Sequence, residues 1–213
     1  MVRRDGQRFD SVLKCVLAGH VTMKIMNRRF VSLVLSIALL AGVLSAAQVP
    51  RHSPEFAINM ADGRQVLLSQ YRGKVVALAF ILTTCPHCQQ TIQVLSKLQN
   101  EYGPRGFQVL ASATDEMPKL YVPDFIRKFQ PPFPVGYSNR DSAIEYLQHP
   151  PTFRMMMPQI VFVDRQGTIR GQYAGDDPFF SGDQEKAIAQ TIDKLLKESA
   201  PVSSRKASRR GQH

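Results

Sequence analysis

The sequence contains no tryptophan and only three cysteines among its 213 residues. So few cysteines exclude a small scaffold held together by disulfide bonds, and an apolar content of 44% excludes a disordered chain. Acidic residues are also scarce, since 17 Asp and Glu stand against 27 Lys and Arg, which gives a formal charge of +10. The composition predicts one ordinary globular domain with additional terminal segments.

The positive charge lies at the two ends of the chain. Residues 1–47 hold seven basic and two acidic side chains, and residues 197–213 hold five and one. The 149 residues between them hold 15 basic and 14 acidic side chains. Because nucleic-acid binding depends on clustered cations, this nearly neutral central part argues against a nucleic-acid partner.

An uncharged apolar stretch lies near the N-terminus. Residues 31–47 (VSLVLSIALLAGVLSAA) follow a short basic segment and end in small side chains. This order is typical of a secretory signal cleaved after Ala47, but the run within 30–50 is also close to the length of a retained membrane anchor. Both alternatives predict a periplasmic or otherwise extracytoplasmic protein, secreted or anchored at its N-terminus.

The chain therefore has three predicted parts. Residues 1–47 form an N-terminal extension with a signal peptide or signal anchor, and residues 48–198 form the folded domain. Residues 199–213 are polar and basic, and such a segment buries too little surface to offset the entropy of ordering it. We expect a disordered tail there.

Strand and helix patterns alternate at the start of the predicted domain. Residues 73–82 (GKVVALAFIL) and 107–113 (FQVLASA) are apolar runs of strand length. Between them, an apolar stripe at helical spacing begins after Pro86 and ends at Gly103. The order strand, helix, strand predicts a parallel βαβ unit and an α/β fold.

Two hairpins flank this unit in the sequence. Residues 56–68 predict a short hairpin that turns at Ala61, Asp62 and Gly63. Residues 159–173 predict a second hairpin with its turn at Arg165, Gln166 and Gly167.

The remaining segments predict helices. The proline-rich residues 117–158 contain helical patterns near 123–129 and 142–147. A final helix follows the second hairpin, with Ser181 and Gln184 spaced as a capping box.

Cys85 and Cys88 form a C-x-x-C motif, TTCPHCQQ, where a buried strand meets a helix, and this setting is typical of a redox pair. Pro86 suits the first helical position, which places Cys85 at the N-cap. There the free amides and the helix dipole stabilise a thiolate, as does a protonated His87. Cys88 lies one turn further on, faces the core and can attack a mixed disulfide at Cys85. The motif predicts Cys85 as nucleophile and Cys88 as resolving thiol.

The alternative for a C-x-x-C pair is half of a structural zinc site, which needs four ligands. The third cysteine, Cys15, lies upstream of the predicted cleavage site, and His52 and His149 are isolated in the sequence. We therefore predict no metal and no cofactor.

Residues 56–196 resemble the thioredoxin fold and, more narrowly, the extracytoplasmic TlpA/ResA type of thiol-disulfide oxidoreductase, which merges with the AhpC/TSA redoxins. The motifs that carry the resemblance are GKVVALAFILTTCPHC, MPQIVFVDRQGTIRGQY and the terminal helix. It implies a central mixed sheet flanked by helices, an N-terminal β-hairpin, and a central insertion of a strand and a helix within 117–150.

The resemblance also implies roles around the motif. Pro158 is expected to follow a cis peptide bond against the active disulfide, with the backbone of Met157 facing Cys85 and pairing with an extended substrate. Thr84 stands where the family usually has tryptophan. The Pro-His dipeptide is shared with DsbA-type oxidases, whereas the overall pattern favours a reductase, so the direction of electron flow stays open.

Two carboxylates that such proteins use as proton acceptors for the buried thiol are missing. The positions six residues before and six residues after the nucleophile hold Ala79 and Thr91. The sequence therefore assigns no base that would deprotonate Cys88, and His87 is the one candidate.

The leading hypothesis is an extracytoplasmic enzyme that exchanges disulfides with exported proteins and has a membrane or periplasmic redox partner. A peroxiredoxin-like peroxide reductase is one alternative, although Leu82 stands where peroxiredoxins place threonine, three residues before the reactive cysteine. A Sco-like copper-binding or delivery protein is another, because thioethers suit Cu(I) and residues 155–157 are three consecutive methionines. The Sco motif, however, has three residues between its cysteines.

Overall fold

The computed structural model describes residues 48–150 and 152–198, which form a mixed sheet with helices on both faces. The strands lie in the order β1 (Arg51–His52), β8 (Thr168–Tyr173), β7 (Gln159–Val163), β4 (Val75–Ile81), β5 (Phe107–Ala113), β6 (Val135–Tyr137), β2 (Ala57–Asn59) and β3 (Gln65–Leu67). The helices are α2 (Pro86–Tyr102), α3 (Pro118–Phe129), α4 (Arg140–Leu147) and α5 (Gln184–Glu198), with short 3-10 turns η1 (Leu68–Tyr71), η2 (Gly103–Arg105) and η3 (Pro178–Phe180).

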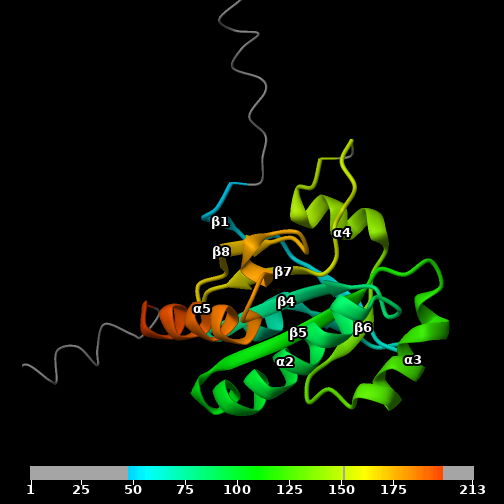
Figure 1. The fold of residues 1–213 in the computed structure, drawn as a ribbon, viewed down its shortest axis with the longest axis horizontal. Helices are drawn as coiled ribbons and strands as arrows, with labels where there is room; N and C mark the ends of the chain where they lie inside the picture. The colour runs from blue at the N-terminus through cyan, green and yellow to red at the C-terminus, as the bar shows by residue number, and fades with distance from the viewer. Residues whose placement is uncertain (1–47, 151, 199–213) are drawn as a thin grey trace, which may run out of the picture. The chain divides into compact units, whose positions relative to one another are not determined.

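Strand β4 lies at the centre of the sheet. It pairs in parallel with β5 and antiparallel with β7, and all seven of its residues are buried. Figure 1 shows α2 on one side of the sheet and α4 on the other. Side chains from α2, α3 and α5 fill one apolar cluster, and those from α4 fill the second. Coverage on both faces explains why this strand is a continuous apolar run, as predicted.

Three connections meet at one edge of the sheet. The parallel strands β4 and β5 end level with each other, since Ile81 pairs with Ala113. Strand β7 begins beside the end of β4, because Gln159 pairs with Phe80. The loop into α2, the loop into α3 and the segment before β7 therefore share this edge, which is where open α/β sheets bind ligands.

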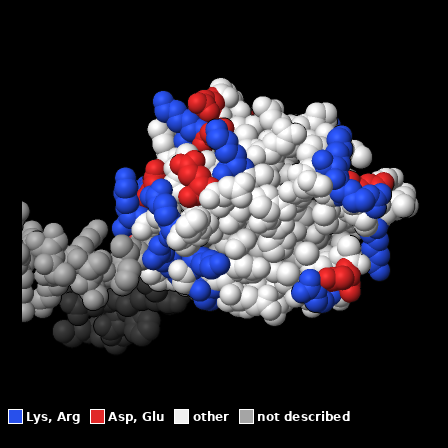
Figure 2. Space-filling view, turned by 90° about the horizontal axis from the view of Figure 1, so that it is seen from below, with Lys and Arg blue, Asp and Glu red and all other residues white. Residues whose placement is uncertain are grey.

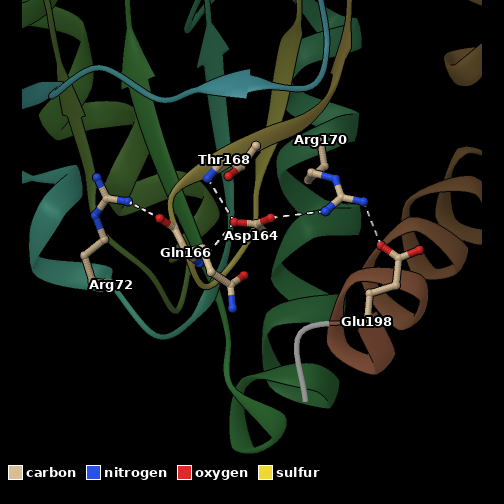
Figure 3. A network of polar contacts seen from close by, with 6 residues as sticks. All are labelled: Arg72, Asp164, Gln166, Thr168, Arg170 and Glu198. Atoms are coloured by element: carbon tan, nitrogen blue, oxygen red, sulfur yellow. Dashed lines mark hydrogen bonds and ion pairs between the residues drawn. The ribbon is translucent and has the colours of Figure 1, made fainter. Parts of the chain in front are cut away.

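The second predicted hairpin is present and is held at its turn by Asp164, whose side chain is 5% exposed. Its Oδ1 accepts hydrogen bonds from the backbone N–H groups of Gln166 at 3.0 Å and Thr168 at 2.9 Å. Its Oδ2 lies 3.3 Å from Nη1 of Arg170, whose Nη2 is 3.0 Å from Glu198 (Figure 3). This network connects the hairpin turn to the end of α5.

The first predicted hairpin is also present. Strands β2 and β3 pair antiparallel, and the N–H of Met60 donates to the carbonyl of Arg64 across the turn. The hairpin extends the sheet beyond β6, because Asn59 pairs with Tyr137.

The two central helices begin earlier than their patterns predict. Helix α3 begins at Pro118, where a proline loses no hydrogen bond, and Pro123 lies inside the helix rather than at its start. Helix α4 begins at Arg140, because the side chain of Asn139 caps it by accepting a hydrogen bond from the N–H of Asp141 at 3.0 Å.

The predicted capping box of the last helix is wrong. Helix α5 begins at Gln184, and the carboxylate of Asp183, rather than Ser181, accepts the N–H of Lys186 at 3.0 Å. Gln184 is buried, and its side chain is a core contact rather than part of a cap.

The end of α2 also differs in detail. Gly103 keeps a right-handed conformation and continues into η2, and Gly106 is the residue with a positive φ, +93°.

Several predictions fall outside the described residues: the signal or anchor over 1–47, the tail over 199–213, and Cys15. Within 48–150 and 152–198, no helix is both long and apolar enough to cross a membrane. On the face drawn in Figure 2, charged side chains of both signs lie in small groups around a broad uncharged area. Charge of one sign is therefore not concentrated on that face.

Candidate active site

The C-x-x-C motif lies at the sheet edge where the three connections meet. Cys85 is the N-cap of α2 and Pro86 its first residue, as the motif predicts. Cys85 is partly exposed, whereas Cys88 is fully buried in the apolar cluster between α2 and the sheet, and both are free thiols. Cys85 is thus accessible to a partner molecule, whereas Cys88 is shielded from solvent.

Cys85 lies at the N-terminal end of the α2 dipole. The first turn contains no acidic residue, and the cysteine side chain makes no capping hydrogen bond. The free amides and the positive end of the helix dipole therefore act on the sulfur atom. His87 is half-buried in the same turn, and its ring packs edge-on against Phe180 of η3, with 5.4 Å between the ring centroids.

Burial raises the pKa of the Cys88 thiol far above its ordinary value. The neighbouring side chain of Cys85 and the negative charge of Asp115 raise the pKa further, while a backbone hydrogen bond from Leu82 opposes them. Cys88 is therefore held as a neutral thiol.

We expect the reduced protein to lose stability as the pH rises above about 8.5, the ordinary pKa of a thiol. The folded state holds the Cys88 proton more tightly than the unfolded chain, because burial raises the pKa. Its contribution to the free energy of unfolding is fully present below the unfolded pKa. It falls above that pKa by up to about 1.4 kcal/mol per pH unit.

Urea unfolding between pH 7 and pH 10.5 checks this expectation, with Cys88→Ala as the control. The tyrosines contribute equally to both proteins, including Tyr146, whose pKa burial raises to about 12. The advantage of the reduced wild-type protein over Cys88→Ala should therefore shrink with pH. An advantage that stays constant over this range contradicts the expectation.

The Met157–Pro158 peptide bond is cis, as the resemblance implies. Pro158 is buried, and Met157 is half-buried and packs against the same apolar cluster as Cys85. Gly175, from the connection after β8, approaches this segment closely: a Cβ atom there would lie 2.3 Å from the carbonyl oxygen of Met157. A residue with a side chain at position 175 would therefore clash with the backbone of this segment.

An open groove of about 890 Å³ adjoins the motif at the same edge. Thr84 is exposed and lines this groove, together with Leu82. The other lining residues come from the ends of β5 and β6 and from β2, α3 and α4: Asn59, Thr114, Asp115, Glu116, Met117, Pro118, Tyr121, Tyr137, Ser138, Asn139 and Arg140. Thr84, the residue before Cys85, thus places the groove next to the motif.

Asp115 is the residue at this site that sequence reasoning missed. Its carboxylate accepts the N–H of Thr83 at 3.1 Å on each oxygen, and the hydroxyl of Thr83 at 2.9 Å. A signal was available, because the residue follows a strand predicted to run parallel to the strand before the motif. Thirty residues of sequence separate it from Cys85, so only the pairing of β4 with β5 brings the two together.

Thr91 is a buried residue of α2 and stands where the resemblance implies a carboxylate. Its hydroxyl lies 2.9 Å from the carbonyl oxygen of His87 and 3.0 Å from Oε1 of Gln184 on α5. Thr91 and Gln184 thus form a neutral buried contact, and this position supplies no base.

The copper-binding and peroxide-reducing alternatives depend on the surroundings of residues 155–157 and of the threonines before Cys85. Met155 is buried in the cluster under α4, Met156 is 41% exposed and Met157 packs between the clusters. The hydroxyl of Thr83 donates to Asp115. Within the described part of the chain, no group of three or more His, Cys, Asp and Glu side chains is placed to hold a metal ion.

Comparisons with known proteins agree with this arrangement. The Redoxin family model matches residues 48–190. The "Thiol-disulfide oxidoreductase ResA" of Geobacillus thermodenitrificans is 29% identical over 126 residues, which cover 59% of this chain and 69% of that protein. The ResA of Bacillus cereus strain ATCC 10987 is 23% identical over 130 residues, which cover 61% and 71%.

Solved structures share the fold. A Chlorobium tepidum protein assigned as thiol:disulfide interchange protein DsbE has a TM-score of 0.61 at 25% identity, over 71% of this chain and 99% of that one. A Bacteroides thetaiotaomicron protein assigned as a protein disulfide isomerase has a TM-score of 0.58 at 26% identity, over 70% and 91%. The chain belongs to the Redoxin family and is a TlpA/ResA-like, thioredoxin-fold thiol-disulfide oxidoreductase.

Proposed function

We propose that Cys85 and Cys88 are the catalytic pair of this oxidoreductase and that it exchanges disulfides with exported proteins outside the cytoplasm. One observation carries the assignment of the residues: a partly exposed cysteine at a helix N-terminus lies one turn from a fully buried one. Pro86, His87, Thr84, Met157 and Pro158 form the environment of the pair.

The proposed reaction has two steps. In the reducing direction, the Cys85 thiolate attacks one sulfur of a substrate disulfide, forms a mixed disulfide and releases the other substrate sulfur as a thiol. Cys88 then loses its proton and attacks Cys85, which closes the Cys85–Cys88 disulfide and releases the second substrate thiol. The oxidising direction is the reverse. The first step needs a sulfur that the substrate can reach, and Cys85 is partly exposed. The second step needs only a sulfur close to Cys85, and the buried Cys88 lies one helical turn away.

The same edge of the sheet offers contacts to a polypeptide substrate. The backbone of Met157 is the proposed partner of an extended chain, and the groove beside Thr84 is wide enough for side chains next to the reacting cysteine. Exposed apolar side chains occur on the connections at this edge, with Met117 55%, Phe153 72% and Met156 41% exposed. Such side chains favour an apolar or partly unfolded polypeptide.

The proposed location rests on the sequence. The basic and then apolar order of residues 1–47 is typical of export, with the signal either cleaved or retained as an anchor. The proposed domain spans 48–198, and its redox partner is a membrane or periplasmic protein. The names of the ResA and DsbE relatives support thiol-disulfide exchange in general.

Trapping of mixed disulfides tests the proposed function. Cys88→Ala leaves the attacking cysteine but removes the thiol that releases the substrate, so exported proteins should accumulate in covalent complexes with this variant. The complexes are separated on non-reducing gels and identified after reduction. The double variant Cys85→Ser, Cys88→Ala is the matched control and should trap nothing. Equal recovery with both variants, or recovery of cytoplasmic proteins alone, contradicts the proposal.

A further inference from the structure

Gln159, the first residue of β7, is a buried polar side chain next to the Met157–Pro158 segment. Only 2% of its surface is exposed, and the other four residues of the strand are apolar. A buried amide costs free energy unless it forms hydrogen bonds, so this side chain needs a partner. Its Nε2 donates to the backbone carbonyl of Met156 at 2.7 Å. The side chain therefore turns back along its own chain to a residue three positions earlier.

The carbonyl of Met156 accepts a second hydrogen bond, from the backbone N–H of Gly175 at 3.3 Å. The start of β7 and the connection after β8 thus hold the same oxygen atom. This oxygen and the N–H of Met157 belong to one planar peptide unit, in which a trans bond points them in opposite directions. The bond between Met156 and Met157 is not one of the two cis bonds in the described part of the chain. Holding the oxygen therefore fixes the direction of the Met157 N–H.

The N–H of Met157 lies at the sheet edge that carries the motif. Gln159 pairs with Phe80 of β4, and continuing this antiparallel register places Met157 level with Leu82. The carbonyl of Leu82 accepts the N–H of Cys85 at 3.2 Å, so the chain turns there into the motif. Among the contacts between described residues, the N–H of Met157 donates to no group. A donor of fixed direction is therefore available beside the loop that carries Cys85.

We propose that Gln159 is a positioning residue for polypeptide substrates: by holding the Met156 carbonyl, it directs the Met157 N–H toward a backbone carbonyl of the chain bound at Cys85. This inference rests on the proposed function and names the substrate class that the site prefers. An extended peptide is recognised through its main-chain hydrogen bonds, whereas a small disulfide without a backbone has no such carbonyl. The contact therefore favours disulfides carried by extended polypeptides.

Gln159→Met tests this role, because methionine has a similar length but no N–H donor. The reduced wild-type protein and the variant are each oxidised by 2-hydroxyethyl disulfide and by a short unstructured peptide whose single cysteine carries the same 2-hydroxyethyl group. The chain contains no tryptophan, so the reaction is followed by acid quenching and mass spectrometry. We expect the ratio of the peptide rate to the small-disulfide rate to fall about fivefold, within the range that one hydrogen bond contributes. A purely structural role would lower the melting temperature without changing this ratio.

Gln108→Met is the matched control. Gln108 lies on β5, and its Nε2 donates to the backbone carbonyl of Val109 at 3.0 Å, so the change removes the same kind of hydrogen bond. It pairs with Val76 near the start of β4, whereas the motif follows the end of that strand. The rate ratio of this variant should equal that of the wild-type protein.

Gln159→Leu keeps the inference testable if Gln159→Met does not fold. Leucine is apolar and suits a buried strand, but it also lacks a donor for the Met156 carbonyl. It should therefore lower the rate ratio by a similar factor.

The outcomes separate this inference from the proposed function. An unchanged rate ratio in the folded Gln159 variants, or an equal fall in Gln108→Met, overturns the role of Gln159. Oxidation of Cys85→Ser by either reagent at the wild-type rate overturns the proposed function instead, whatever the Gln159 variants show.

Discussion

Cys85→Ser is expected to reduce disulfide exchange by a factor on the order of 1,000 or more, because a serine hydroxyl is almost fully protonated at neutral pH and does not attack sulfur. The residue is the N-cap of α2 and makes no capping hydrogen bond through its side chain. A serine side chain is a good N-cap. The loss of activity should therefore come without loss of folding. Dithiothreitol-coupled reduction of insulin measures the effect.

Cys88→Ser is the matched comparison for this loss. It removes the buried thiol but leaves the attacking one, so a single round of attack on a substrate disulfide should remain, followed by slow release. Stopped-flow measurement of that first round separates the two variants. If Cys85→Ser keeps the first round and Cys88→Ser loses it, the two roles are reversed.

Gly175→Ala is expected to impair both stability and exchange. Its Cβ would lie 2.3 Å from the carbonyl oxygen of Met157, 2.5 Å from its carbonyl carbon and 3.0 Å from the nitrogen of Pro158. All three are backbone atoms, so the segment itself has to move. We expect a loss of about 1–3 kcal/mol in the free energy of unfolding, as for other overpacked sites. Exchange should fall about tenfold or more, since small displacements of positioning groups are costly.

Gly171→Ala provides the control for this prediction. It makes the same change in β8, but the nearest atom to its Cβ, at 3.0 Å, belongs to the side chain of Tyr173 and not to the backbone. We expect a loss below about 1 kcal/mol, as for a contact that a side chain can relieve, and unchanged exchange by the folded protein. Urea unfolding and the insulin assay are run on both variants. Equal exchange rates in the two contradict the role given to the Met157–Pro158 segment.

Local patterns predicted most of the elements that carry the site. The buried run of β4, the apolar stripe of α2 and the two hairpins follow from periodicity and turn residues that lie close together in the sequence. Pro86 at the first helical position was enough to place Cys85 at the N-cap. The resemblance to a known family added the cis bond before Pro158, which no local pattern indicates.

The predictions of the α3 start and of the α5 cap were wrong because the same residue type or spacing occurs in more than one structural role. Pro123 looks like a helix start, but Pro118 supplies that start and α3 continues through the later proline. Gln184 has the spacing of a capping residue, but burial against Thr91 on α2 takes its side chain into the core. For Gln184, packing against a neighbouring helix outweighed the local preference.

The sequence by itself predicted the residues to which we assign the chemistry, because a C-x-x-C pair at a strand-to-helix boundary needs only four consecutive positions and the free amides of one helix turn. Only the tertiary structure decided what surrounds that pair. Asp115 reaches the loop before the motif from 30 residues away, and Gly175 lies against the Met157–Pro158 segment, since strand pairing and close backbone approach are long-range contacts that no local spacing encodes. The reactivity of the dithiol therefore depends on parts of the chain that a motif does not contain.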